Sequence, residues 1–258
     1  MKKEKVLIFV LTHRDEWKYG YPKGYHTLWL GMKSHTIDRS YPWRDDNLPS
    51  GSLCDQNYLY SEYSGFYFLW KSLQAEDSNA IIVIDHYDWF FSKKRVFRFM
   101  LTQTDVRRLM KKNEVYFPTP TDIASNFNGM DVYALNRTAL AANIDLLEPA
   151  IAKLYPEALT ALREVYASHS LCSGNMMICR KSFFDGYAGF YFAIIDEIKD
   201  RIDLTGIKDR RIFGFMGEIL INVFANYKKA QLACLPASSC LPIRQQISSK
   251  WREVRKKD

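Results

Sequence analysis

The sequence lacks the short motifs that mark several large classes of enzyme. Its 258 residues contain neither Gly-x-Gly-x-x-Gly nor Gly-Lys-Ser/Thr, which excludes the usual dinucleotide-binding and P-loop sites. Gly-x-Ser-x-Gly is also absent, so the sequence has no nucleophile elbow of the hydrolase type. The five histidines show no spacing typical of metal ligands.

Cysteine is scarce. The chain has five cysteines, an odd number, and no Cys-x-x-Cys pair. This argues against a disulfide framework and against a zinc knuckle. We expect reduced and mostly buried thiols in a cytosolic protein.

Long apolar runs are also missing. No segment approaches the ~18 uninterrupted apolar residues that a transmembrane helix needs, so none is expected. The apolar run Val6–Leu11 is short and is followed by polar residues without a small-residue cleavage site. It is interpreted as a buried first strand rather than as a signal peptide.

The formal net charge is +7, and the pI is about 9.0. Such a balance suits nucleic acid, an anionic membrane surface or a phosphorylated substrate. The densest basic cluster lies in the last residues, and no nucleic-acid-binding motif is present, so no nucleic-acid partner is expected. Salt-dependent RNA binding that survives removal of residues 236–258 would reverse this expectation.

The chain is organised around residues 80–91. Four β-branched residues run directly into Asp85, His86 and Asp88, which predicts a strand covered on both faces and ending in polar side chains. Open α/β sheets bind ligands at the carboxyl ends of their strands. A reactive site and a strand end held by local hydrogen bonds are both compatible with these residues.

The remaining pattern alternates strands and helices and predicts one α/β domain with a mixed central sheet flanked by helices. Residues 16–52 show no clear period and are predicted to be a long loop region. Thr104 is the predicted N-cap of a helix through Lys112. The other predicted strands are 6–11, 115–117, 176–180 and 231–235, and the other predicted helices are 61–74, 136–167 with breaks at Pro149 and Pro156, 183–202 and 215–227.

A second polar signal lies in the last predicted helix. Between Phe215 and Ala225 its only charged residue is Glu218. A carboxylate in so apolar a helix needs a partner. Arg211 and Glu218 fall on one helix face, so Glu218 either forms a structural pair with Arg210 or Arg211 or faces a ligand cleft.

Asp85 and Asp88 form an Asp-x-x-Asp pair at a strand end. Two carboxylates there could hold Mg²⁺ or Mn²⁺ against a diphosphate, because hard cations take oxygen ligands and share them with phosphates. His86 could instead act as a phosphate donor or a base. The turn Ser173-Gly174-Asn175 could aim Asn175 at a ligand, although turns of this composition are usually only turns.

Residues 236–258 differ from the rest and are predicted to be a separate basic tail following a domain at 1–235. Ile247, Trp251 and Val254 recur at helical spacing among lysines and arginines. This is typical of an amphipathic segment at a membrane surface. A solvated, frayed tail is the alternative.

Several separated segments together resemble a bacterial family of capsule, exopolysaccharide and O-antigen biosynthesis proteins, catalogued as domain of unknown function 4422. Members are associated with glycosyl transfer, including galactofuranosyl transfer. The resemblance covers most of residues 5–235. The matching residues are Asp55-Gln56-Asn57, Ser61-Glu62, Trp70-Lys71, His86-Tyr87, Phe90-Phe91, Leu154-Tyr155-Pro156-Glu157, Asn175-Met176, Lys181, Phe184, Arg211-Ile212-Phe213-Gly214-Phe215, Glu218 and Asn222.

The resemblance implies a glycosyltransferase-A-like domain that moves a sugar from a nucleotide donor to a growing cell-surface polysaccharide. The donor is expected to be UDP-linked, with UDP-galactofuranose as a candidate. The site residues combine this pattern with the polar strand ends. Asp85, His86 and Glu218 are the expected catalytic residues, with Glu218 as the base and Asp85 as the runner-up. The family pattern contributes Asn57, Glu62, Asn175 and Arg211 as donor or acceptor contacts, and the strand ends contribute Thr12, His13, Tyr87 and Asp88 as donor contacts.

One departure from the family matters. The family usually has His-Tyr-Arg-Arg where this chain has His86-Tyr87-Asp88-Trp89. The missing arginines would be natural phosphate partners. Either Asp88 recruits a metal in their place, or the basic residues at 93–95 supply the charge. A non-catalytic glycan-assembly partner with a degenerate donor site is the alternative function.

The expected acceptor is a lipid-linked saccharide. The expected location is therefore the cytoplasm, with peripheral contact to the inner face of the cytoplasmic membrane through the basic tail.

Overall fold

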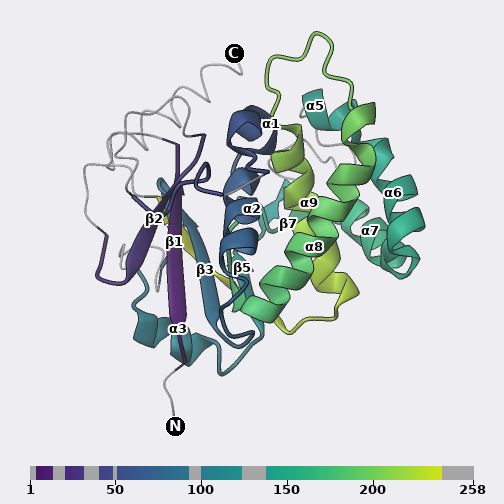
Figure 1. Cartoon of the computed structure of the whole chain (residues 1–258). Coiled ribbons are helices and arrows are strands. Elements are labelled where there is room, and N and C mark those ends of the chain that lie inside the picture. The colour runs from purple at the N-terminus through teal and green to yellow at the C-terminus, as the bar shows by residue number, and fades with distance from the viewer. Residues whose placement is uncertain are drawn as a thin grey trace, which may run out of the picture.

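The computed structural model describes residues 4–13, 21–31, 41–48, 51–92, 100–123 and 138–239. Within these ranges six strands form one mixed sheet in the order β2-β1-β3-β8-β5-β9. The predicted α/β architecture, a mixed central sheet flanked by helices, is confirmed (Figure 1). The strands of this sheet are β1 Val6–Thr12, β2 Tyr25–Trp29, β3 Ile81–His86, β5 Val115–Pro118, β8 Met177–Arg180 and β9 Leu232–Leu235.

The three strands β2, β1 and β3 are parallel, whereas β8 runs antiparallel to both β3 and β5. The register places Val10 beside Asp85 and Leu11 beside His86. The carboxyl ends of β1 and β3 therefore meet at one edge of the sheet, where a crevice forms in open α/β folds.

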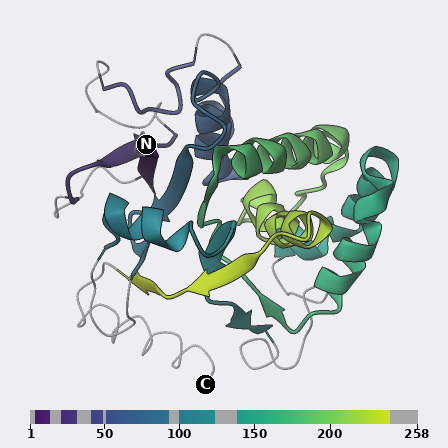
Figure 2. The same ribbon diagram turned by 90° about the horizontal axis from the view of Figure 1, so that it is seen from below.

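Helices cover both faces of this sheet. The helices are α1 Asn57–Tyr60, α2 Tyr63–Ser72, α3 Gln103–Leu109, α5 Thr138–Ala141, α6 Leu147–Leu154, α7 Leu159–Tyr166, α8 Lys181–Ile198 and α9 Ile212–Tyr227. Short 3-10 turns at 54–56, 144–146, 156–158 and 199–201 adjoin them. In Figure 2, α2 and α3 lie on opposite sides of the strands.

Alternation along the strands divides the core into two clusters. Ile82 and Ile84 belong to the larger cluster, with α2, α8 and α9. Ile81 and Val83 belong to the smaller one, with α3. Burial on both faces explains why β3 has no polar alternation before its last residues.

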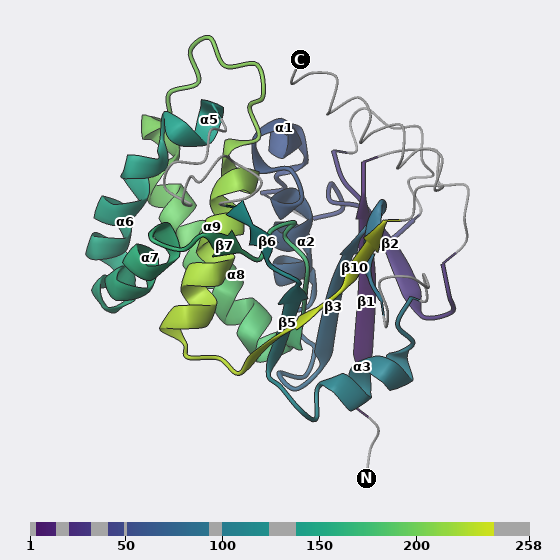
Figure 3. The same ribbon diagram turned by 180° about the vertical axis from the view of Figure 1, so that it is seen from behind.

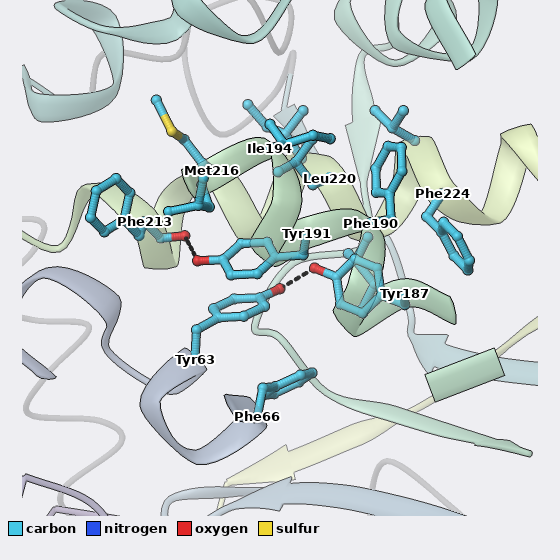
Figure 4. Packing of buried hydrophobic residues seen from close by; sticks show 14 of the residues in the cluster. Tyr63, Phe66, Tyr187, Phe190, Tyr191, Ile194, Phe213, Met216, Leu220 and Phe224 are labelled. Atoms are coloured by element: carbon cyan, nitrogen blue, oxygen red, sulfur yellow. Dashed lines mark hydrogen bonds between the residues drawn. The ribbon is translucent and has the colours of Figure 1, made fainter. Parts of the chain in front are cut away.

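Three buried tyrosines join the helices of the larger cluster (Figure 4). The Tyr63 and Tyr191 rings stack at 4.0 Å, and the hydroxyls of Tyr63 and Tyr187 form a hydrogen bond. The Tyr187 hydroxyl also donates to the Gly217 carbonyl at 3.2 Å. Because a Cβ at Gly217 would overlap the Tyr63 ring, this glycine permits α9 to approach α2.

Two smaller sheets complete the described chain. Strand β4, Trp89–Phe91, pairs antiparallel with β10, Ala237–Ser239. Strand β6, Thr121–Asp122, pairs with β7, Ser170–Leu171, beside α9 (Figure 3). Pairing thus continues past residue 235, and the division into 1–235 and 236–258 stays a prediction.

Four differences from the sequence-based prediction of the elements have a clear physical reason or consequence. The N-cap of α3 is Thr102 rather than Thr104, because Thr102 and Asp105 form a reciprocal capping box. Strand β2 lies within the predicted loop region 16–52. Pro149 does not break α6, because it sits in the first turn, where a missing N–H is tolerated. Helix α9 begins at Ile212 and not at Phe215.

Candidate functional site

Two adjoining cavities lie beyond the carboxyl ends of β1 and β3. The larger has a volume of about 530 Å³, and the smaller about 190 Å³. The larger is lined by Ser61, Glu62, His86, Ala139, Gly174, Asn175, Asp209, Arg211, Gly214, Phe215 and Glu218. The smaller is lined by Leu11, His13, Leu30, Asn57, Ser61, Glu62, His86, Tyr87, Asp88, Trp89 and Arg211.

Four residues line both cavities and form their shared wall: Ser61, Glu62, His86 and Arg211. Ser61 and Glu62 stand at the entry to α2, His86 ends β3, and Arg211 precedes the first residue of α9. Three parts of the chain, far apart in the sequence, therefore meet at the shared wall. The structure brings together three of the predicted site residues there, Glu62, His86 and Arg211.

The backbone at Ser61 is in an unusual conformation, with φ 52° and ψ −127°. L-residues other than glycine rarely adopt a positive φ, and such strain is concentrated at functional sites. Helix α9 packs closely here, since a Cβ added at Gly214 would lie 2.9 Å from the Ser61 Cβ. The conformation at Ser61 and the absence of a side chain at Gly214 together shape the meeting point of α2 and α9.

Glu62 is a partly buried carboxylate on the shared wall. Burial acts to raise its pKa, but the charge of His86, a hydrogen bond from Ser61 and the charge of Arg211 outweigh burial and lower it. Glu62 is therefore ionised at neutral pH. It supplies a fixed negative charge to the shared wall, next to Arg211.

His86 lies between the two cavities. Its Nε2 atom is buried and has no hydrogen-bond partner among the described residues. A buried polar atom without a partner is rare in folded proteins and calls for an explanation. A ligand that reaches the shared wall would supply the missing partner.

Arg211 is held in place by a neighbour on its own segment. Its Nε and Nη2 atoms donate to the two carboxylate oxygens of Asp209 at 2.9 and 2.7 Å. Its guanidinium also lies over the Phe215 ring, 5.2 Å from the centroid. The Asp209 hydrogen bond, and then the charges of Glu62 and Glu218, raise the Arg211 pKa. The exposed arginine is thus presented to the cavities as a permanent cation.

Glu218 projects from α9 into the larger cavity. Its Oε1 accepts a hydrogen bond from the Gly174 N–H at 3.3 Å. One turn further along α9, the Asn222 amide bonds both the N–H and the carbonyl of Cys172, at 3.3 and 3.0 Å. Glu218 therefore lines the cleft, while the bidentate partner of Arg211 is Asp209.

Asn175 closes the larger cavity on the side of the loop before β8. Its φ is 50°, and its side chain is 4% exposed. The amide donates to the Gly214 carbonyl at 3.2 Å, and its oxygen accepts from the Tyr63 hydroxyl at 3.0 Å. The predicted donor contact therefore lines the cavity while it fastens the loop to α9 and α2.

The smaller cavity gathers aromatic rings. His13 and Tyr87 meet edge to face, with their centroids 5.1 Å apart. Trp89 lies on the same cavity and is 47% exposed. Flat rings beside a partly polar wall can pack against a nucleobase or a sugar ring.

Asn57 lines the smaller cavity from α1 and is held by a polar network. Its Nδ2 donates to the Ser61 carbonyl and to the Ser64 hydroxyl, each at 2.8 Å. The Ser64 hydroxyl donates to the buried carboxylate of Asp45 at 2.8 Å. This network fixes the Ser61 backbone, so Asn57 supports the shared wall as well as lining a cavity.

Asp85 lies apart from both cavities. Its side chain is 1% exposed, its Oδ1 accepts the Phe91 N–H at 2.9 Å, and its Oδ2 is buried without a hydrogen-bond partner among the described residues. Burial raises its pKa to about 8, against the lowering effect of the Phe91 hydrogen bond. The structure does not bring Asp85 together with His86 at the cavities.

The residues at this edge fit a two-carboxylate metal site poorly. Asp88 lines the smaller cavity, but the Asp85 carboxyl is enclosed on the other side of the sheet and is favoured in its protonated form at neutral pH. A protonated carboxyl is a poor ligand for Mg²⁺ or Mn²⁺. Within the described ranges no cluster of three or more His, Cys, Asp or Glu side chains could hold a metal ion. The proposed chemistry therefore has no step through a metal.

Other predictions concern the margins of the site. Thr12 is the last residue of β1 and is 2% exposed. Its carbonyl accepts a hydrogen bond from the Leu30 N–H at 2.8 Å. The next residue, His13, lines the smaller cavity. The basic residues at 93–95 and the tail from residue 240 lie outside the described residues. Among the helices that the structure describes, none is long and apolar enough to cross a membrane.

Sequence reasoning missed several residues that line the cavities, among them Ser61, Gly174 and Trp89. Nothing in the sequence signals the positive φ at Ser61, because serine carries no such preference. Gly174 follows a serine in an ordinary turn pattern. Trp89 had a signal, since it belongs to the dipeptide that departs from the family pattern.

Comparisons with known proteins identify relatives of the chain. A family described as "Domain of unknown function (DUF4422)" matches residues 7–229. No curated protein matches. The solved apo structure of WbbM, a bifunctional glycosyltransferase, superposes with a TM-score of 0.76 at 18% sequence identity, over 92% of this chain and 45% of that one. The aligned region covers less than half of the WbbM chain, and the shared fold agrees with the predicted α/β class, a mixed central sheet flanked by helices.

Proposed function

Since the chain belongs to the family described as domain of unknown function 4422, and shares its fold with a glycosyltransferase, we propose that it is a glycosyltransferase that uses a nucleotide-sugar donor. The finer proposal is a UDP-linked donor, with UDP-galactofuranose as the first candidate. The acceptor is a growing cell-surface polysaccharide on a lipid carrier, reached from the cytoplasmic face of the membrane.

One observation supports this proposal most directly, namely the shared wall. His86 Nε2 lacks a partner among the described residues, and Arg211 presents a cation beside it. A diphosphate carries negative charge on acceptor oxygens and so complements both groups. The wall also lies beyond the carboxyl ends of parallel strands, where such ligands bind in α/β folds.

The two cavities suggest a division of the donor. The nucleoside would occupy the smaller cavity, near the His13 and Tyr87 rings. The diphosphate would reach the shared wall, and the sugar would enter the larger cavity beside Asn175 and Glu218. The volume of the larger cavity lies within the range that small-molecule sites usually have.

In transfer, an acceptor hydroxyl oxygen bonds to the anomeric carbon of the donor sugar. The bond from that carbon to the diphosphate oxygen breaks, and the nucleoside diphosphate leaves with the electron pair. When the transfer inverts the anomeric configuration, a carboxylate must accept the hydroxyl proton, and Glu218 is the proposed base. Arg211 and His86 would stabilise the charge that develops on the leaving diphosphate.

The test is a screen of the purified chain against nucleotide sugars, with and without Mn²⁺, read as binding by calorimetry and as donor hydrolysis. UDP-galactofuranose, UDP-galactose, UDP-glucose and GDP-mannose are the probes. We expect at least one UDP-sugar to bind and to be hydrolysed slowly. If none of the probes binds or turns over under either condition, the enzyme proposal fails and a non-catalytic role in glycan assembly replaces it.

Two histidine variants make the screen specific for the site. His86→Ala should weaken donor binding at least tenfold, because it removes the side chain at the shared wall. His169→Ala is the matched control, since His169 is exposed and lines neither cavity. Equal binding by the two variants would contradict the placement of the diphosphate.

A further inference from the structure

A third and larger hollow lies beside the site. It is a groove of about 800 Å³, here called the aromatic groove. Three aromatic side chains of α2 and α8, Tyr67, Trp70 and Phe192, form one wall. Trp70 stacks on Phe192 at 5.6 Å with an interplanar angle of 9°, and Tyr67 meets Phe192 edge to face at 5.1 Å.

The groove and the larger cavity adjoin along two segments of the chain. Tyr60 lines the groove, and Ser61 lines the cavity. Phe213 likewise lines the groove and Gly214 the cavity, and the Tyr60 and Phe213 rings pack at 4.6 Å. Just before α9, Arg210 lines the groove and Arg211 lines the larger cavity. Neighbouring residues of the same two segments therefore line the groove and the larger cavity, and the packed Tyr60 and Phe213 rings lie on the groove side of that boundary.

Gly189 is the unusual residue of this surface. It lies inside α8, an 18-residue helix, where glycine destabilises a helix relative to alanine. Helical glycines are often required by close packing, and Gly217 is such a case. At Gly189 a Cβ would meet nothing within 4 Å, so packing does not explain the glycine. Because Gly189 has no side chain, the groove stays open at this position and beside Ala193, which lies one turn further along α8.

The charges around the groove narrow the class of occupant. Three cations and two carboxylates line it: Lys199 pairs with Asp196 at 2.6 Å, Lys71 lies over the Trp70 ring at 3.7 Å from the centroid, and Arg210 and Asp200 complete the set. Because positive and negative charges nearly balance around the groove, it suits neither a polyanion nor a polycation. It also disfavours a hydrocarbon chain, which would desolvate charged groups without pairing them. Hydroxyl groups can hydrogen-bond to both signs of charge, while the C–H faces of sugar rings pack on aromatic side chains.

We propose that the aromatic groove binds the acceptor glycan, holding an uncharged oligosaccharide segment next to the sugar that receives the transfer. This proposal rests on the proposed glycosyl transfer. The segment lies along the wall formed by Tyr67, Trp70 and Phe192, with Gly189 and Ala193 beside it. Its terminal sugar reaches past the Arg210–Arg211 edge into the larger cavity.

The test uses an array of neutral and acidic oligosaccharides of three to six sugars, probed with the fluorescently labelled full-length chain. Gly189→Leu places a bulky side chain in the groove and replaces glycine with a better helix former, so it should not unfold the protein. Ser182→Leu is the matched control, on an exposed position of α8 outside the groove. The melting temperature of each variant is measured beside the array.

We expect the wild-type chain and Ser182→Leu to bind the same neutral oligosaccharides, and Gly189→Leu to bind them at least tenfold more weakly with an undiminished melting temperature. Absence of binding by the wild-type chain, or equal binding by Gly189→Leu, would overturn the proposal. Capture of a fluorescent fatty-acyl probe that Gly189→Leu abolishes, without glycan binding, would assign the groove to a lipid instead. Donor hydrolysis by the wild-type chain is scored separately, so the groove can fail while the enzyme proposal stands.

Discussion

Asp85 and His86 are consecutive residues of β3, yet their side chains lie on opposite faces of the sheet. His86 faces the two cavities together with residues of α2 and α9. Asp85 is enclosed on the other side, where it accepts the N–H of Phe91. The period of two along a strand separates their roles: His86 can meet a ligand, whereas Asp85 fixes the turn that carries His86, Tyr87 and Asp88.

This separation predicts an unusual pH dependence of stability. The Asp85 pKa is raised from 3.8 to about 8 in the fold, so between these values the native state holds a proton that the unfolded state releases. The free energy of unfolding from this group therefore falls as pH rises, by up to about 1.4 kcal/mol per pH unit, and is constant above pH 8.

Asp85→Asn keeps an oxygen for the Phe91 N–H and cannot ionise. We expect urea unfolding of this variant to lose the decline in stability that the wild-type chain shows between pH 5 and pH 8. Asp122→Asn is a suitable control, because that residue is exposed. If the free energy of unfolding of Asp85→Asn falls between pH 5 and pH 8 as much as that of the wild-type chain, a group other than Asp85 causes the decline.

Glu218→Gln tests the proposed base. Glutamine retains an oxygen for the Gly174 N–H but cannot take a proton from an acceptor hydroxyl. We expect kcat to fall by about 10²–10⁴-fold with donor affinity and melting temperature nearly unchanged. Glu164→Gln, at an exposed position of α7, is the control. If Glu218→Gln unfolds instead, the carboxylate is structural.

The fold and the site were predictable to different degrees. The β-branched run at 81–84 was enough to predict β3, because a strand that is buried on both faces consists almost entirely of apolar, often β-branched residues. Strand β10 was not predictable, since Ala237–Ser239 has no strand pattern and depends on pairing with β4. The sequence also pointed to Glu62, His86 and Arg211 only as separate residues. Their convergence depends on the approach of α9 to Ser61, which no local pattern encodes.

Two glycines, Gly217 in the core and Gly189 on the aromatic groove, predict opposite effects of the same substitution. Gly217→Ala should destabilise the fold by about 1–3 kcal/mol or more, because the new Cβ would overlap the Tyr63 ring and force α2 and α9 apart. Gly189→Ala should stabilise it by about 0.5–1 kcal/mol, because its Cβ enters open space. Chemical denaturation of both variants measures the difference. Equal effects would mean that α9 does not lie against Tyr63 as described.

Asn175→Ala tests whether Asn175 couples the loop at the larger cavity to the buried Tyr63 and to α9. The substitution removes the donor to the Gly214 carbonyl and the acceptor for the Tyr63 hydroxyl, both of which are buried. It also places alanine at a φ of 50°, which asparagine tolerates better. We expect a loss of about 1–3 kcal/mol, because two hydrogen bonds worth about 0.5–1.5 kcal/mol each are lost while the Tyr63 hydroxyl keeps Tyr187 as a partner. Faster hydrogen exchange at residues 172–175 and at the start of α9 should accompany it. A loss of stability without faster exchange there would show that Asn175 does not fasten the loop to α9.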